Sequence, residues 1–170
     1  MTSSPSHALD ALDARLLAVL AAEPRIGVLE CSRRLGVARG TVQARLDRLT
    51  ARGVIADFAP TVDPAALGYP VTAFVTLEIQ QGRGHEAVAG DLARIAEVLE
   101  VHTITGPGDM FCRVVARSNA DLQRVIDAVV ATAGILRTST IIALATQVPH
   151  RVLPLVHAAA GEPRVQPAAR

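Results

Sequence analysis

The sequence predicts an α+β chain built in two parts, a helical N-terminal part and a C-terminal part that mixes strands with helices. Apolar residues recur every three to four positions in the first 53 residues, a spacing typical of amphipathic helices. From about position 70 onward, segments that alternate apolar and polar residues are interleaved with helical segments. Positive charge is concentrated in the first part, which indicates that the two parts have different roles.

The composition is that of a folded globular protein. The chain has 170 residues, 50% of them hydrophobic, and its 17 basic and 16 acidic side chains leave a formal net charge of +1. This apolar content and charge balance exclude disorder throughout and allow a buried core. The densest apolar run, 16–22, is about a third of the ~20 residues that a membrane-spanning helix needs.

The sequence shows no sign of secretion, metal binding or catalysis. Its first residues lack a basic stretch followed by an apolar one, so we expect a cytoplasmic protein. Cys31 and Cys112 are too few for a disulfide framework and form no CxxC pair. The histidines lack metal-ligand spacing, and no nucleophile–base or paired-carboxylate arrangement is visible. We therefore expect no cofactor, no metal site and no enzymatic activity.

Arginine supplies all 17 basic side chains. Six of them lie in 31–53 against one acid, a local charge of +5, whereas 61–157 holds seven arginines and nine acids, a local charge of −2. A guanidinium is planar and offers several donors, which suits phosphate oxygens and guanine edges. The basic segment therefore favours an anion-binding role, against the alternative of a solvated helix face.

A helix-turn-helix domain is predicted over 9–53. The apolar spacing predicts helices over 9–22, 28–35 and 39–52. Pro24, Gly36 and Gly53 lie just beyond the three predicted ends, where helix-stopping residues are expected. Two helices joined by a short turn that contains glycine are typical of DNA-binding helix-turn-helix domains.

The third predicted helix has small residues in the middle of its exposed face. On a helical wheel the stripe around Leu46 faces the core, and Gly40, Ala44 and Ala51 lie opposite. Small residues there let the backbone approach a DNA groove, so that neighbouring polar side chains reach base edges or phosphates. An ordinary surface helix is the alternative. The candidate DNA-binding residues are Arg39, Thr41, Gln43, Arg45, Arg48 and Arg52.

The N-terminal part resembles the DNA-binding domain of the Lrp/AsnC (feast/famine) transcriptional regulators. The resemblance rests on LDALDARLLAVLAAEPRI and LECSRRLGVARGTVQARLDRLTARGVI, and the order of elements extends it over 9–149. It implies a winged-type helix-turn-helix whose third helix enters the major groove. Family members commonly start that helix with a serine; Ala38 stands here, and losing a side-chain cap typically costs ~1 kcal/mol.

A ferredoxin-like domain is predicted over 70–149. It follows a linker (54–69), in which apolar and polar residues over 54–63 alternate enough to predict a strand. The expected strand, helix, strand, strand, helix and strand cover 71–79, 85–98, 99–105, 110–116, 120–131 and 135–147. This order implies a four-stranded antiparallel sheet with both helices on one face. A second copy of the domain is the simplest cover for the other face, so we expect a homodimer.

The turn 105–109 is the candidate ligand site of this domain. Its glycines leave backbone N–H groups open to a carboxylate and its acid suits an ammonium, the two poles of an amino acid. The alternative is an ordinary tight turn between two strands, which needs the same residues. The resemblance implies that a Gly–x–x–Asp turn at this place borders the effector pocket between dimers. It also implies effector contacts from the last strand, although any sheet favours β-branched residues there. Met110 stands where the family often has an aromatic residue. The expected effector-binding residues are Gly106, Gly108, Asp109, Thr138, Ser139 and Thr140.

The resemblance implies a sequence-specific transcriptional regulator that binds double-stranded DNA and responds to an amino acid or similar small effector. The second domain is then the effector-sensing and oligomerisation domain, and a dimer is expected to assemble further, for example into an octamer. Two alternatives remain open: an Lrp-like enzyme such as a sirohaem decarboxylase, and a DNA-architectural protein without an effector. The ends, 1–8 and 158–170, show no periodicity, and we expect them to be disordered.

Overall fold

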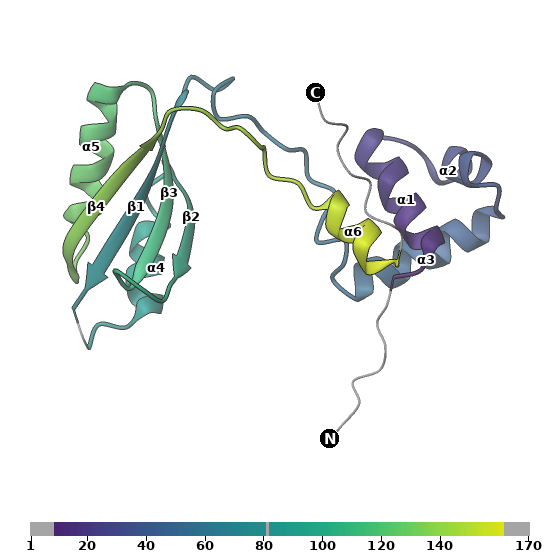
Figure 1. Cartoon of the computed structure of the whole chain (residues 1–170), viewed down its shortest axis with the longest axis horizontal. Helices are drawn as coiled ribbons and strands as arrows, with labels where there is room; N and C mark the ends of the chain where they lie inside the picture. The colour runs from purple at the N-terminus through teal and green to yellow at the C-terminus, as the bar shows by residue number, and fades with distance from the viewer. Residues whose placement is uncertain (1–8, 81, 162–170) are drawn as a thin grey trace. The chain divides into compact units, whose positions relative to one another are not determined.

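The structure, a computed structural model, describes residues 9–80 and 82–161 and divides into two compact units. The first unit comprises the chain up to Pro60 together with the segment from Val148, and the second spans Thr61–Gln147. Figure 1 shows that the first unit is helical and that the second contains the sheet. No helix in the described part of the chain is long and apolar enough to cross a membrane. Residues 1–8, which we expected to be disordered, lie outside the described ranges.

Three helices build the helix-turn-helix of the first unit: α1 (Ala11–Ala22), α2 (Val28–Leu35) and α3 (Arg39–Ala51). A capping box starts α1, because Asp10 Oδ1 accepts the Asp13 N–H at 2.8 Å and Asp13 Oδ2 accepts the Asp10 N–H at 3.3 Å. Gly36 ends α2 in the left-handed conformation, with φ of 68°. Ala38 precedes α3 and provides no side-chain cap, as its identity predicts. The helices enclose a core of Leu16, Cys31, Leu35, Val42, Leu49 and Ile55.

A fourth helix, α6 (Leu153–Ala159), also belongs to the first unit, where it packs against α1. The apolar spacing of the sequence did not predict it. The expectation of disorder over 158–170 is wrong for residues 158 and 159, which lie in this helix, and 162–170 are outside the described residues. An isolated helix of seven residues is marginal in water, so its packing on α1 stabilises it, and no local pattern reveals that contact.

The second unit contains β1 (Val71–Ile79), α4 (His85–Leu92), β2 (Val98–Thr103), β3 (Met110–Ala116), α5 (Asn119–Val130) and β4 (Ile135–Ala143). The sheet has the strand order β2-β3-β1-β4, and each neighbouring pair is antiparallel. This βαββαβ order is the ferredoxin-like arrangement that the sequence predicts. Together with the N-terminal helix-turn-helix, it confirms the α+β fold class.

Both helices of the second unit cover the same face of the sheet. Alternate residues of the central strand β1, such as Val75 and Leu77, are fully buried. They share one core cluster with Val88 of α4 and Val125 of α5. Because side chains alternate between the faces of a strand, the other half of β1 points away from this core.

That opposite face carries apolar side chains. The rings of Phe74 on β1 and Phe111 on β3 stack with their centroids 5.5 Å apart. Ile141 pairs with Phe74 across the β1–β4 ladder, and its side chain is 63% exposed. A contiguous apolar patch of this kind is typical of a protein–protein interface. The homodimer expected from the sequence remains a prediction that this face supports.

The strand predicted over 54–63 is absent from the structure. Ile55 packs in the core of the first unit, but Phe58 and Val62 are 66% and 58% exposed, so the segment does not bury one alternating face. Alternation produces a strand only where a neighbouring strand supplies hydrogen-bond partners. Two further elements end early: the helix predicted over 85–98 ends at Leu92, where a turn begins, and the last strand ends at Ala143. The remaining elements match their predicted ends to within two residues.

Candidate nucleic-acid interface and ligand turn

One apolar stripe anchors α3 to the first unit. Val42 and Leu49 are 1% and 0% exposed, and Leu46 packs against the same core. Since these residues recur at three- and four-residue steps, they determine which side of the helix faces outward. The core-facing side expected from the helical wheel is confirmed.

The outward face of α3 has a centre of small residues and a polar border. Gly40 and Ala44 are exposed at its centre, and Arg39, Thr41 and Gln43 are exposed around them. Nothing lies within 4 Å of where a Cβ on Gly40 would be, so the backbone is accessible there. Three of the six predicted DNA-binding residues therefore border one accessible stretch of helix.

Arg45 and Arg48 are instead directed toward the start of α1. Nη1 of Arg45 donates to Asp13 Oδ1 at 2.7 Å and to the Asp10 oxygens at 2.6 and 2.7 Å. Nη2 of Arg48 donates to both Asp13 oxygens at 2.7 Å. The Asp13 side chain is only 1% exposed, so the two arginines supply the opposite charge that a buried carboxylate requires. We refer to Asp10, Asp13, Arg45 and Arg48 as the acid clamp.

The acid clamp keeps its exposed acid ionised. The hydrogen bond from Arg45 holds the pKa of the Asp10 carboxyl below its ordinary value of 3.8, and the same bond raises the pKa of Arg45. A carboxyl with a lowered folded-state pKa stabilises the fold above its unfolded pKa and loses that contribution as the pH falls through the folded value. The Asp10–Arg45 pair is therefore charged throughout the neutral range.

Neither acid of the clamp was among the predicted functional residues. Asp10 and Asp13 lie three residues apart at the beginning of a predicted helix, which is a capping-box spacing that could have singled them out. The pairing with α3 had no such signal, because it joins residues 32 to 35 positions apart.

Arg52, the sixth predicted DNA-binding residue, is the C-cap of α3. Its backbone N–H donates to the Arg48 carbonyl at 3.0 Å, and its side chain is half-buried. The predicted residues are therefore divided among three places: the outer face of α3, the acid clamp and the end of the helix.

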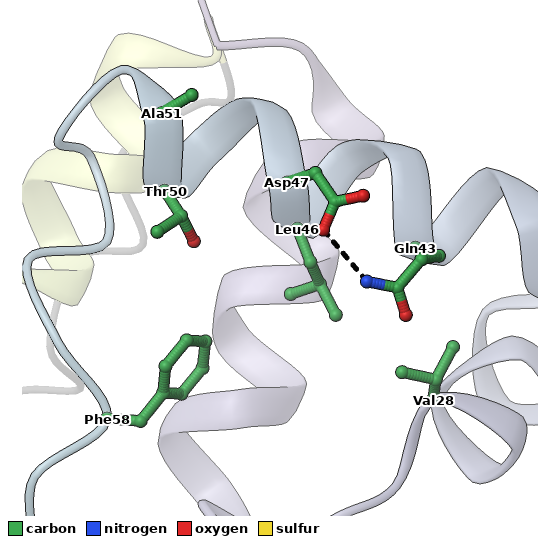
Figure 2. A pocket seen from close by; sticks show the side chains of 7 residues that line it. All are labelled: Val28, Gln43, Leu46, Asp47, Thr50, Ala51 and Phe58. Atoms are coloured by element: carbon green, nitrogen blue, oxygen red, sulfur yellow. Dashed lines mark hydrogen bonds between the residues drawn. The ribbon is translucent and has the colours of Figure 1, made fainter.

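The other flank of α3 borders a hollow (Figure 2). Side chains from α3, the first residue of α2 and the segment after α3 line it, namely Val28, Gln43, Leu46, Asp47, Thr50, Ala51 and Phe58. Gln43 Nε2 donates to Asp47 Oδ1 at 2.8 Å, which holds the amide along the helix at the edge of this hollow. Phe58, in the segment predicted as a strand, is an exposed aromatic residue beside the helix that the sequence analysis did not single out.

The predicted ligand turn is tied to the end of β1. The Asp109 N–H donates to the Leu77 carbonyl at 2.8 Å, and Asp109 Oδ2 accepts the Ile79 N–H at 2.8 Å. The carboxylate thus has a structural partner at the point where the β1–β4 register shifts, between Glu78 and Ile79. These contacts are those of a tight turn between strands, and the acid that they hold is half-buried.

The two glycines of the turn have positive φ, 125° at Gly106 and 128° at Gly108. A Cβ on Gly108 would lie 2.5 Å from Thr76 Cγ2 and 3.1 Å from the Leu77 carbonyl oxygen. A Cβ on Gly106 would meet nothing within 4 Å. Gly108 therefore allows the close approach of the turn to β1, whereas Gly106 leaves open space beside its backbone.

The three polar residues of β4 do not form one cluster. Thr138 and Thr140 pair with Leu77 and Val75, so they lie on the helix-covered face and are half-buried. Ser139 pairs with Thr76 on the opposite face and is exposed. The strand β1 lies between these residues of β4 and the turn 105–109. Its Leu77 pairs with Thr138 on one side and accepts the hydrogen bond from Asp109 N–H on the other.

Comparisons with known proteins identify both units. The Lrp/AsnC ligand binding domain matches residues 72–153, and the AsnC-type helix-turn-helix domain matches residues 9–50. The chain is similar to the HTH-type transcriptional regulator FL11 of Pyrococcus horikoshii, with 31% identity over 147 residues that cover 86% of this chain and 97% of the relative.

Two solved structures extend the similarity to three dimensions. AsnC of E. coli has a TM-score of 0.78 and 27% identity, covering 86% of this chain and 99% of its own. A feast or famine regulatory protein from M. tuberculosis complexed with L-methionine has a TM-score of 0.75 and 29% identity, covering 85% of this chain and 97% of its own.

The fold and the accessible helix thus define a helix-turn-helix regulator joined to a ligand-binding domain. The chain belongs to the Lrp/AsnC family of transcriptional regulators. The family expected from the sequence is confirmed.

The close approach at Gly108 can be tested by substitution. We predict that Gly108→Ala lowers the free energy of unfolding by about 1–3 kcal/mol, because the new Cβ clashes with β1 and the positive φ strains an L residue. Urea denaturation measures this change. Gly90→Ala is the control, since Gly90 lies inside α4 with nothing within 4 Å of an added Cβ, and alanine there should stabilise by up to about 1 kcal/mol. A Gly108→Ala protein as stable as the wild type would contradict the close approach.

Proposed function

We propose that the chain is a sequence-specific DNA-binding regulator whose α3 enters the major groove. The observation that carries this proposal is the accessible stretch of small residues at Gly40 and Ala44, on the side of α3 opposite its buried stripe. A helix of about 10–12 Å diameter fits a major groove of about 12 Å width, and small residues allow the deepest approach.

Within this interface, the outer-face residues have the most direct access to DNA. We infer that Arg39, Thr41 and Gln43 contact bases or adjacent phosphates from the exposed border of α3. Arg45, Arg48 and Arg52 lie toward its edge and its end, and we infer that they border the interface. The hydrogen bonds of Arg45 and Arg48 to Asp10 and Asp13 limit what these two side chains can contribute.

We further infer that an amino acid or similar small effector binds at the turn 105–109. Backbone N–H groups of a glycine turn suit a carboxylate, and Asp109 suits an ammonium. A relative of known structure is complexed with L-methionine, which supports an amino acid as the class of ligand. Thr138 and Thr140 would contact such a ligand from one face of β4, and Ser139 only from the other.

Dimerisation and further assembly would connect the two functions. The apolar sheet face around Phe74, Phe111 and Ile141 supports a homodimer. An effector that binds between dimers, in an assembly such as an octamer, acts only if its affinity differs between assembly states. DNA binding then changes because the spacing of the helix-turn-helix units changes.

Selection of binding sites from a random duplex library, followed by gel shifts at fixed salt, tests the DNA-binding function. We predict that Ala44→Leu weakens binding to the selected site at least about tenfold, because a bulky side chain at the centre of the face keeps the backbone out of the groove. Leucine is a good helix former, so the fold should be retained. Ala87→Leu, at an exposed position of α4, is the matched control and should bind as the wild type does.

Three outcomes of this experiment bear on the alternatives. Wild-type affinity in Ala44→Leu would remove the outer face of α3 from the interface. Tight binding with no preferred sequence would favour a DNA-architectural protein. A wild-type chain that binds no duplex but acquires visible absorbance with a sirohaem-type tetrapyrrole would favour the enzyme.

Thermal shifts with each of the twenty amino acids test the effector. Binding to the folded state raises the melting temperature, and we predict such a rise for the wild type. Asp109→Asn keeps an oxygen that can accept the Ile79 N–H but removes the charge, so the fold should persist while the rise is lost. An unchanged rise in Asp109→Asn would exclude the carboxylate as the ammonium ligand. No rise with any amino acid in the wild type would contradict an amino-acid effector.

A further inference from the structure

The acid clamp occupies donors that a DNA phosphate would otherwise use. Nη1 of Arg45 is shared among three carboxylate oxygens, two from Asp10 and one from Asp13. Nη2 of Arg48 is shared between both oxygens of Asp13. A backbone phosphate that approaches this flank of α3 must compete with carboxylates that are already in contact.

Burial of Asp13 makes its pairs with Arg45 and Arg48 more persistent than the exposed Arg34–Glu23 pair of the first unit, whereas Asp10 in the clamp is itself 51% exposed. Arg34 pairs with Glu23 at 2.6 Å, but both side chains are substantially exposed, at 41% and 51%. Exposed pairs are weak and are readily replaced by water or salt. Asp13 is 1% exposed, so releasing its arginines would leave a buried charge without a partner.

The clamp also changes the charge that α3 presents. The +5 of residues 31–53 includes Arg45 and Arg48, and the acids that contact them lie outside that segment, at the start of α1. The clamp holds two arginines and two acids, so its own net charge is zero. The local surface is therefore less attractive to phosphate than the charge along the sequence indicates.

We propose that Asp10 and Asp13 are specificity-determining residues, which hold Arg45 and Arg48 against α1 and so suppress binding to DNA of arbitrary sequence. The proposal rests on the DNA-binding function proposed above. Phosphate contacts carry no sequence information, so each arginine withheld from them lowers non-specific affinity. Base contacts by the outer face of α3 then make up a larger share of the binding free energy.

The test uses Asp10→Asn in the full chain. Asparagine is among the best helix N-caps, so it can still accept the Asp13 N–H while it removes the charge of one of the two carboxylates that hold Arg45, leaving only the contact with Asp13 Oδ1. Asp13→Asn would be the more direct change, but Asp13 is buried and its loss endangers the fold. Asp57→Asn is the matched control, because Asp57 lies in the same unit and its Oδ1 likewise accepts a backbone N–H, that of Ala59, at 3.0 Å.

The measured quantity is the affinity for a random-sequence 40-base-pair duplex as a function of salt concentration. We expect Asp10→Asn to bind about three- to tenfold more tightly than the wild type at low salt, with a log–log salt slope steeper by about 0.9, as for one added phosphate contact. Asp57→Asn should keep the wild-type slope. The double variant Asp10→Asn/Arg45→Ala should lose the added affinity, because the released guanidinium is gone.

The outcomes separate this inference from the proposed function. Equal affinity and slope for Asp10→Asn and the wild type would overturn the inference and leave DNA binding intact. The same gain of affinity in Asp57→Asn, or a gain that persists in the double variant Asp10→Asn/Arg45→Ala, would assign the effect to net charge. Either result would also overturn the inference. If Asp10→Asn changes the melting temperature but leaves the salt slope of DNA binding unchanged, the clamp has only a structural role and the inference is wrong. Failure of every variant to bind any duplex would overturn the proposed function and the inference with it.

Discussion

The burial of the Asp13 carboxylate at the start of α1 is the constraint on which the helix-turn-helix depends. A buried charge without a partner costs several kcal/mol, so α3 must be placed where Arg45 and Arg48 reach that carboxylate. Val42 and Leu49 set the rotation of the same helix by filling the core. With one side of α3 buried and one flank held by acids, the face around Gly40 and Ala44 is left open to meet a groove.

A comparable constraint shapes the second unit. Both helices pack on one face of the sheet, where alternate residues of β1 are fully buried. The turn 105–109 is hydrogen-bonded to this strand, and the exposed Ile141 of β4 pairs with it. Asp109 attaches the turn to that strand through hydrogen bonds to backbone groups. Gly108 lacks a side chain and so allows the turn to approach the strand closely. The candidate ligand site is thus built on the end of a strand whose alternate residues are buried.

The sequence predicted what depends on local periodicity and missed what depends on contacts between distant segments. The three helices, the order of strands and helices along the second domain and the small-residue face of α3 follow from spacing within a few residues. The helix α6 and the clamp pairs do not, because each requires a partner far along the chain. The strand predicted over 54–63 was wrong because no strand among the described residues pairs with this segment. Charge counted along the sequence likewise overstated the basic surface, since the two acids that contact Arg45 lie 35 and 32 residues away.

The most direct test of the account is to locate α3 on DNA with a cleavage reagent attached at Thr50→Cys, an exposed position of α3 outside the face around Gly40 and Ala44. Cys31 and Cys112 are 1% and 0% exposed, and burial raises the pKa of the Cys112 thiol to about 11, so a thiol-directed metal chelate would attach at the new position. On the selected duplex, the account predicts strand cleavage confined to a few adjacent base pairs of the major groove. Cleavage spread evenly along the duplex, or no cleavage while a gel shift shows the labelled protein bound, would contradict it.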